Sequence, residues 1–252
     1  NTEETLEACE QAMIQDGTIV VISSGGILSG MCELSESMYL ISCPGGQPPR
    51  SAFGHIFSRQ LSLLVEIGVL QSEITDEALD RLQEAMDDSD IITHPEGDVA
   101  SLALNMMENP IAILGPSELL PAINRFKNQL NENSARFARI GVFPEVNHNE
   151  SVAWGGVGDD QDPESSNQAL ALLSWDGMHN RVEQRMDWFV SNCPTDLAWR
   201  IHGDGESLLE CLLHLCIMMD WLSVALGLLH GKNPSAIVPI ISLKEYLAQI
   251  NQ

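Results

Sequence analysis

Residues 111–143 read IAILGPSELLPAINRFKNQLNENSARFARIGVF and predict a strand, a helix and a second strand in that order. Residues 111–114 form a short apolar run that ends at Gly115-Pro116, which is typical of a buried strand. Residues 118–131 have the length and pattern of a helix, and residues 138–143 form the next strand. Strands that alternate with helices of this length predict a parallel α/β sheet.

The same alternation extends over the rest of the chain. We expect further strands at 18–22, 38–43, 169–175 and 197–201, and further helices at 2–15, 27–36, 50–67, 74–88, 99–107, 180–193, 207–230 and from 237 onward. The fold class is therefore α/β, with parallel-sheet units at 1–72 and 97–252 and a charged connector at 73–96. The second unit has enough strands for a doubly wound parallel sheet. The first unit has only two strands, so it resembles half a domain.

The charge balance excludes one large class of partner. The chain has 252 residues, with 12 Lys and Arg against 36 Asp and Glu, so its net charge is −24. A protein that binds the nucleic-acid backbone needs clustered cations, and we expect no nucleic-acid partner. The hydrophobic fraction of 44% is that of a globular protein. The acidic surface is consistent with a solvated anionic coat that keeps the protein soluble.

Residues 207–230 are apolar enough to raise the question of a membrane helix. Glu210, His214 and Asp220 interrupt the stretch, and a central Asp costs about 2.5–3.5 kcal/mol in a bilayer. We therefore predict a core helix and no membrane contact. Six cysteines without a C-x-x-C pair predict buried free thiols, as expected for a cytoplasmic protein.

Common nucleotide and catalytic motifs are missing from the sequence. It has no G-x-x-x-x-G-K-[ST], no G-x-G-x-x-G after a strand, no G-x-S-x-G and no H-E-x-x-H. The most unusual polar stretch is 142–150, VFPEVNHNE, which places two carboxylates, a histidine and two amides directly after a strand. Ligands bind at the carboxyl ends of parallel strands, so this stretch is the first candidate site.

Two simpler interpretations of this stretch remain open. Its polar side chains satisfy nearby backbone groups in many loops of this kind. Alternatively Glu145, His148 and Glu150 bind zinc, although no thiol pair or second histidine pair supports a metal site.

The stretch FPEVNHNESVAWGG at 143–156, with RFKNQLNEN at 125–133, closely resembles the bifunctional phosphoglucose/phosphomannose isomerases, a family with two sugar-isomerase (SIS) domains. The family pattern there is R-W-K-x-Q-x-x-E-N followed by P-E-x-N-H-N-x-x-x-G-W. Further matches follow the family order at NTEET (1–5), PGGQPPRSA (44–52), HNRV (179–182) and LK (243–244). The resemblance covers nearly the whole chain and implies two SIS-type units, the first incomplete.

Departures from the family pattern accompany these matches. The family's first strand, its G-G-S loop and the serines of its S-x-S phosphate loop would precede Asn1, and residues 158–167 resemble an insertion. We therefore expect a chain that lacks an N-terminal segment and is inactive or weakly active as printed.

The resemblance implies roles for a carboxylate and a guanidinium. Glu145 matches the family's base, which moves a proton between C2 and C1 of an opened sugar. Arg50 matches the arginine that stabilises the enediolate oxygen, and the alternative is a surface arginine that ends a proline loop.

The family match also covers two groups with acid–base or polar roles. His179 matches the ring-opening histidine, which in the family comes from the neighbouring subunit and so implies a homodimer. Asn180 replaces the usual proline beside it, and the alternative is a histidine that only begins a helix. Lys244 matches the closing lysine near the sugar hydroxyls, and the alternative is a solvated charge.

Two hydroxyl residues complete the implied site. Thr2 lies at a helix N-terminus, where N–H groups favour a phosphate, and it also suits plain N-capping. Ser235 falls where family members often carry a threonine near the sugar.

The resemblance implies an aldose–ketose isomerase of carbohydrate metabolism, in glycolysis and gluconeogenesis. It would interconvert glucose 6-phosphate or mannose 6-phosphate with fructose 6-phosphate through a cis-enediol, with no metal or nucleotide cofactor and with its site between the two units. The alternatives are a strict phosphoglucose isomerase and a non-catalytic SIS-type sensor that binds a sugar phosphate.

Overall fold

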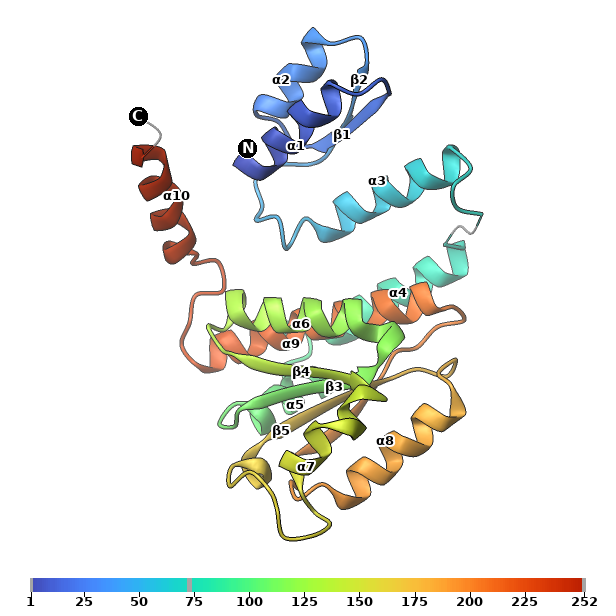
Figure 1. Cartoon of the computed structure of the whole chain (residues 1–252), viewed down its shortest axis with the longest axis vertical. Helices are drawn as coiled ribbons and strands as arrows, with labels where there is room; N and C mark the ends of the chain where they lie inside the picture. The colour runs from blue at the N-terminus through green and yellow to red at the C-terminus, as the bar shows by residue number, and fades with distance from the viewer. Residues whose placement is uncertain (1, 72–73, 251–252) are drawn as a thin grey trace. The chain divides into compact units, whose positions relative to one another are not determined.

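The computed structural model describes residues 2–71 and 74–250, which divide into two units, Asn1–Glu73 and Ile74–Gln252 (Figure 1). The stretch that we interpret as a connector carries α4 (Asp76–Ser89). This helix packs against α9 (Leu208–Leu229), so it is part of the second unit.

The first unit is built around a two-stranded parallel sheet. It contains α1 (Glu3–Met13), β1 (Ile19–Ser23), α2 (Ile27–Leu34), β2 (Met38–Ser42) and α3 (Phe53–Glu66). Strands β1 and β2 run in parallel with Ile19 opposite Met38. Its small core consists of Cys9, Val21, Leu28 and Met38, and none of the residues of α3 is buried.

The second unit is built around a four-stranded parallel sheet in the order β4-β3-β5-β6. Its strands are β3 (Ile111–Pro116), β4 (Ala138–Phe143), β5 (Ala169–Ser174) and β6 (Ala198–His202). Besides α4 and α9, its helices are α5 (Asp98–Met106), α6 (Leu120–Asn133), α7 (Glu150–Trp154), α8 (Asn180–Asn192) and α10 (Val238–Ile250). Short 3₁₀ turns lie at η1 (Ser117–Leu119), η2 (Glu145–His148) and η3 (Ser165–Asn167).

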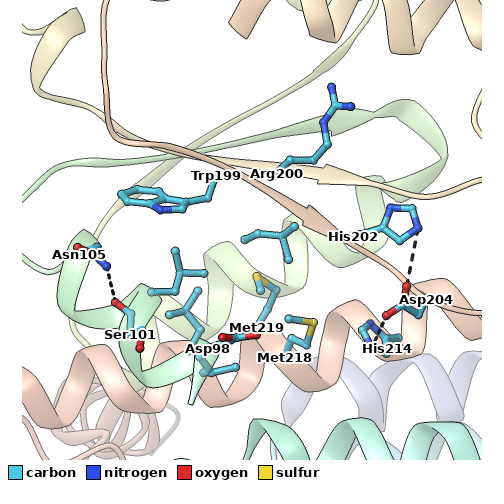
Figure 2. A pocket seen from close by; sticks show the side chains of 14 residues that line it. Asp98, Ser101, Asn105, Trp199, Arg200, His202, Asp204, His214, Met218 and Met219 are labelled. Carbon is cyan, nitrogen blue, oxygen red and sulfur yellow. Dashed lines mark hydrogen bonds and ion pairs between the residues drawn. The ribbon is translucent and has the colours of Figure 1, made fainter. Parts of the chain in front are cut away.

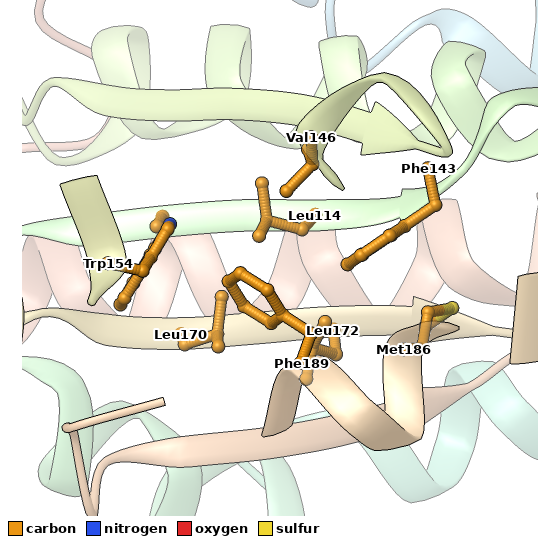
Figure 3. Close-up of a cluster of buried hydrophobic side chains, with 9 residues drawn as sticks. Leu114, Phe143, Val146, Trp154, Leu170, Leu172, Met186 and Phe189 are labelled. Atoms are coloured by element: carbon orange, nitrogen blue, oxygen red, sulfur yellow. The ribbon is translucent and has the colours of Figure 1, made fainter. Parts of the chain in front are cut away.

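Apolar side chains project from both faces of this sheet, because successive residues of a strand point in opposite directions. On one face, Leu114 of β3 packs in one cluster with Phe143 of β4, Trp154 of α7 and Phe189 of α8 (Figure 3). Phe189 meets both Phe143 and Trp154 edge to face, with ring centroids 5.5 Å apart in each pair. Helix α6 packs against β3, β4 and α9. The predicted α/β class with parallel sheets is confirmed, and so are all six predicted strands.

Helix α9 lies within the second unit and packs against α4, α5 and α6. Among the described helices it is the one long and apolar enough to cross a membrane. Its acidic residues are paired: Glu210 accepts two hydrogen bonds from Arg81, at 2.5 and 3.0 Å. Asp220 accepts two from Arg125, at 3.0 and 2.5 Å. These contacts are those of the core helix that the sequence predicts.

Candidate active site

The polar residues that matter most follow the strands of the second unit. Because β3, β4, β5 and β6 are parallel, the loops after them lie at the same edge of the sheet. Glu145 begins η2 directly after β4, and His179 precedes α8 after β5. Strand β3 lies between these two strands, and its loop is tied to that of β5 by Trp175 Nε1, which donates to Glu118 Oε1 at 3.1 Å.

Glu145 is exposed on a turn that is anchored by its neighbour. Val146 is only 2% exposed and belongs to the core under α7 and α8. The turn is closed by Asn147 N, which donates to Pro144 O at 3.0 Å, and by Ser151 Oγ, which donates to Val146 O at 3.2 Å. The turn therefore presents a solvent-accessible carboxylate from a fixed backbone.

One side chain that the sequence analysis did not single out contacts this carboxylate. Asn149 Nδ2 donates to Glu145 Oε1 at 2.9 Å, and Asn149 Oδ1 accepts from Glu150 N at 2.6 Å. The second bond makes Asn149 the N-cap of α7. Its place within the polar stretch, directly before the first residue of a helix, is the signal that would have identified it as a capping amide.

Helix α7 is in turn held on β4. Arg139 NH1 lies 3.3 Å from Glu150 Oε2, and the Arg139 guanidinium lies 4.8 Å from the centre of the Trp154 ring. At Gly141, a Cβ atom would lie 2.8 Å from Val146 Cγ2 and 3.0 Å from Glu150 Oε1. Glycine is therefore what lets η2 and α7 approach the strand this closely.

The zinc interpretation of Glu145, His148 and Glu150 finds no support in this geometry. The Glu150 carboxylate is directed to Arg139 instead. Within residues 2–71 and 74–250, no three His, Cys, Asp or Glu side chains are grouped as metal ligands.

His179 is the N-cap of α8 and is exposed. Its Nδ1 accepts from Arg181 N at 3.1 Å. An Nδ1 that accepts a hydrogen bond leaves the proton of the neutral ring on Nε2, which is then the nitrogen available for exchange with a ligand.

The remaining candidates lie apart from these loops in the chain. Thr2 precedes α1, and its hydroxyl lies 2.6 Å from that of Thr5 without capping the helix. Arg50 is partly exposed in the turn between β2 and α3. Both belong to the first unit. In the second unit, Ser235 N donates to Asn233 Oδ1 at 2.9 Å, and Lys244 is exposed on α10.

The second unit also contains a cavity of ≈ 440 Å³ between α5, β6 and α9 (Figure 2). His202 Nε2 lies 3.4 Å from Asp176 Oδ1 and 3.8 Å from Asp204 Oδ1, while His214 Nε2 lies 3.6 Å from Asp204 Oδ2. Burial lowers the pKa of His214, although the nearby Asp204 opposes this effect. The residues that line the cavity include none of the six site residues predicted from the sequence.

All six cysteines lie in the described part of the chain and are free. Cys9, Cys43, Cys211 and Cys216 are buried. Burial raises the pKa of Cys216 to about 12, so this thiol stays protonated at neutral pH. The prediction of free, largely buried thiols is confirmed.

Comparison with solved structures shows the fold. Glucosamine-6-phosphate deaminase from Thermotoga maritima superposes with a TM-score of 0.66 at 16% identity, over 93% of this chain and 69% of that one. Tagatose-6-phosphate ketose/aldose isomerase from Escherichia coli gives a TM-score of 0.66 at 13% identity, over 93% and 67%.

Comparison of sequences shows the family. Residues 96–247 match the bacterial phospho-glucose isomerase C-terminal SIS domain. The bifunctional phosphoglucose/phosphomannose isomerase of Aquifex aeolicus is 31% identical over 252 residues, which is 98% of this chain and 73% of that protein. That of Caldicellulosiruptor bescii is 29% identical over 263 residues, or 99% and 74%. The D-glucosamine-6-phosphate 4-epimerase of Sulfolobus acidocaldarius is 32% identical over 151 residues, or 60% and 46%. The chain belongs to the bifunctional phosphoglucose/phosphomannose isomerase family, and most of its second unit is that family's C-terminal SIS domain.

Proposed function

We propose that this chain belongs to an enzyme that interconverts glucose 6-phosphate or mannose 6-phosphate with fructose 6-phosphate. The observation that carries the proposal is Glu145, an accessible carboxylate at the carboxyl edge of a parallel sheet, on a turn fixed by Val146 and Asn149. A sensor needs contacts to a phosphate but no base, whereas an isomerase needs a carboxylate free to accept a proton.

The proposed reaction moves one proton between adjacent carbons. His179 carries the proton of the C1 hydroxyl to the ring oxygen while the bond between C1 and the ring oxygen breaks. This step opens the sugar to its aldehyde. Glu145 then takes the C2 proton, and the electron pair of that C–H bond forms the C1–C2 double bond of a cis-enediolate. Glu145 returns the proton to C1, while the C2 hydroxyl loses its proton and O1 gains one, which yields the ketose.

The remaining predicted residues bind the substrate in this proposal. The Arg50 guanidinium donates to the enediolate oxygen, where negative charge develops. Thr2 contributes to phosphate binding at the N-terminus of α1, and Lys244 and Ser235 contact sugar hydroxyls. The reaction as proposed uses no metal or nucleotide.

We place the protein in the cytoplasm, in glycolysis and gluconeogenesis, as a homodimer in which His179 serves the partner's site. Six free cysteines are consistent with a reducing compartment.

The decisive experiment uses protein expressed from the complete coding sequence, incubated with fructose 6-phosphate in deuterium oxide. Deuterium should enter C1 of fructose 6-phosphate, and both glucose 6-phosphate and mannose 6-phosphate should form. Glu145→Gln should lower the rate roughly 10²–10⁴-fold, the range of general base catalysis. No exchange by the unmodified protein would favour the sensor, and glucose 6-phosphate as the only aldose product would favour a strict phosphoglucose isomerase.

The same assay tests the dimer. His179→Asn retains a capping oxygen for α8 but removes the imidazole. If His179 acts across the dimer, mixing inactive Glu145→Gln and His179→Asn subunits restores one intact site per mixed dimer, or about a quarter of the original activity after random exchange. A mixture as inactive as its components would place His179 in its own subunit's site.

A further inference from the structure

Asn149 uses opposite ends of its side-chain amide on two different partners. Its Nδ2 donates to Glu145 Oε1 at 2.9 Å, and its Oδ1 accepts from Glu150 N at 2.6 Å. A backbone N–H can donate only to the carbonyl end of the amide. The bond to Glu150 therefore fixes which end faces Glu145.

The donor is fixed in space because α7 is fixed on β4. The side chain of Glu150 is paired with Arg139, and Arg139 lies against the ring of Trp154, which is 2% exposed. The close approach at Gly141 brings the same turn against the strand. The orientation of the Asn149 amide thus derives from the sheet rather than from a mobile loop.

We propose that Asn149 is a positioning residue for the Glu145 base. It holds Oε1 of the carboxylate, so that Oε2 is presented to the substrate carbon in one orientation. The proposal rests on the isomerase function above and adds to it a residue outside the reacting set. Without the amide, the exposed Glu145 side chain samples several rotamers, only some of which reach the proton.

Asn149→Asp is the sharpest test because it separates the two hydrogen bonds. Aspartate caps a helix about as well as asparagine, so α7 keeps its N-cap. A carboxylate cannot donate to Glu145, and it adds a like charge beside it. We expect kcat to fall roughly 10–100-fold, as for a misplacement of about 1 Å, with little change in KM and an unchanged Tm.

Asn105→Asp is the matched control. Asn105 is exposed on α5, its Nδ2 donates to Ser101 O at 2.8 Å, and the substitution makes the same change of charge. It should leave kcat and KM as they are in the unmodified protein. Asn149→Ala, which removes both hydrogen bonds, should lower kcat and also the Tm.

The outcomes separate this proposal from the proposed function. An unmodified protein without exchange or isomerisation would refute the function itself. An active protein in which Asn149→Asp keeps kcat within about threefold would overturn the positioning role. An Asn149→Asp variant that lost activity through a higher KM, or together with a lower Tm, would also overturn it.

Discussion

The two units of the chain bury their sheets to very different extents. In the second unit every residue of β3 and β5 is buried, and helices cover both faces. In the first unit β2 buries only Met38, while Tyr39 and Leu40 are 57% and 42% exposed. A parallel sheet is stable when both faces are covered. The second unit meets this condition with its own helices, whereas the described part of the first unit leaves one strand largely open.

A matched pair of leucines gives the largest expected contrast. Leu114 in β3 is fully buried, and Leu40 in β2 is not. Leu114→Ala should lower the free energy of unfolding by about 2–5 kcal/mol, because it leaves a cavity in a close-packed core. Leu40→Ala should cost less than about 0.5 kcal/mol. Urea unfolding followed by circular dichroism measures both, and equal costs would mean that β2 is covered in the native protein.

The second unit also buries a charged group, the Glu210 carboxylate, which is paired with Arg81. The hydrogen bond from Arg81 holds the pKa of Glu210 below its ordinary value. Glu210→Gln should cost about 1.5–3 kcal/mol at pH 7, toward the low end because Arg81 is 39% exposed and water screens the pair.

The sign of the pH dependence follows from this lowered pKa. The stabilisation is present above the pKa of Glu210 in the unfolded chain and is lost as the pH falls through its lower value in the folded protein. The difference between the unmodified protein and Glu210→Gln should therefore shrink from pH 7 toward pH 3 in urea titrations. A difference that grew with acid would contradict the pairing.

Two helical glycines give the smallest effects, with opposite signs. At Gly227 in α9 a Cβ atom would lie 2.4 Å from Asn133 O, whereas a Cβ at Gly30 in α2 would meet no atom within 4 Å. Gly227→Ala should destabilise by about 1–3 kcal/mol, because it forces α6 and α9 apart. Gly30→Ala should stabilise by about 0.5–1 kcal/mol through helix propensity. Thermal unfolding of both variants checks the signs, and a stabilised Gly227→Ala would mean that the two helices are more loosely packed.

The sequence was most informative where burial is greatest. The strand at 111–114 was predictable because a fully buried parallel strand must be a short apolar run. That the polar stretch 142–150 is a candidate site followed from the rule that ligands bind at the carboxyl ends of parallel strands. Both predictions depend on local pattern and topology alone.

Features that depend on tertiary contacts were not predictable in this way. Helix α7 has five residues, too few for a recognisable apolar repeat. The second role of Asn149 depends on where α7 lies relative to η2, which spacing does not encode. The roles given to all six site residues rest on the family resemblance and stay predictions: Glu145, His179, Arg50, Thr2, Ser235 and Lys244.

The missing side chain at Gly141 constrains the chemistry from a distance. A Cβ atom at Gly141 would press on the side chains of Val146 and Glu150, so this position limits how closely the turn that carries the proposed base approaches β4. A substitution there would displace the carboxylate and its amide partner together. A loss of turnover in a Gly141 variant would therefore come from functional groups that are intact but displaced. An activity assay alone would not distinguish it from the loss of a reacting residue.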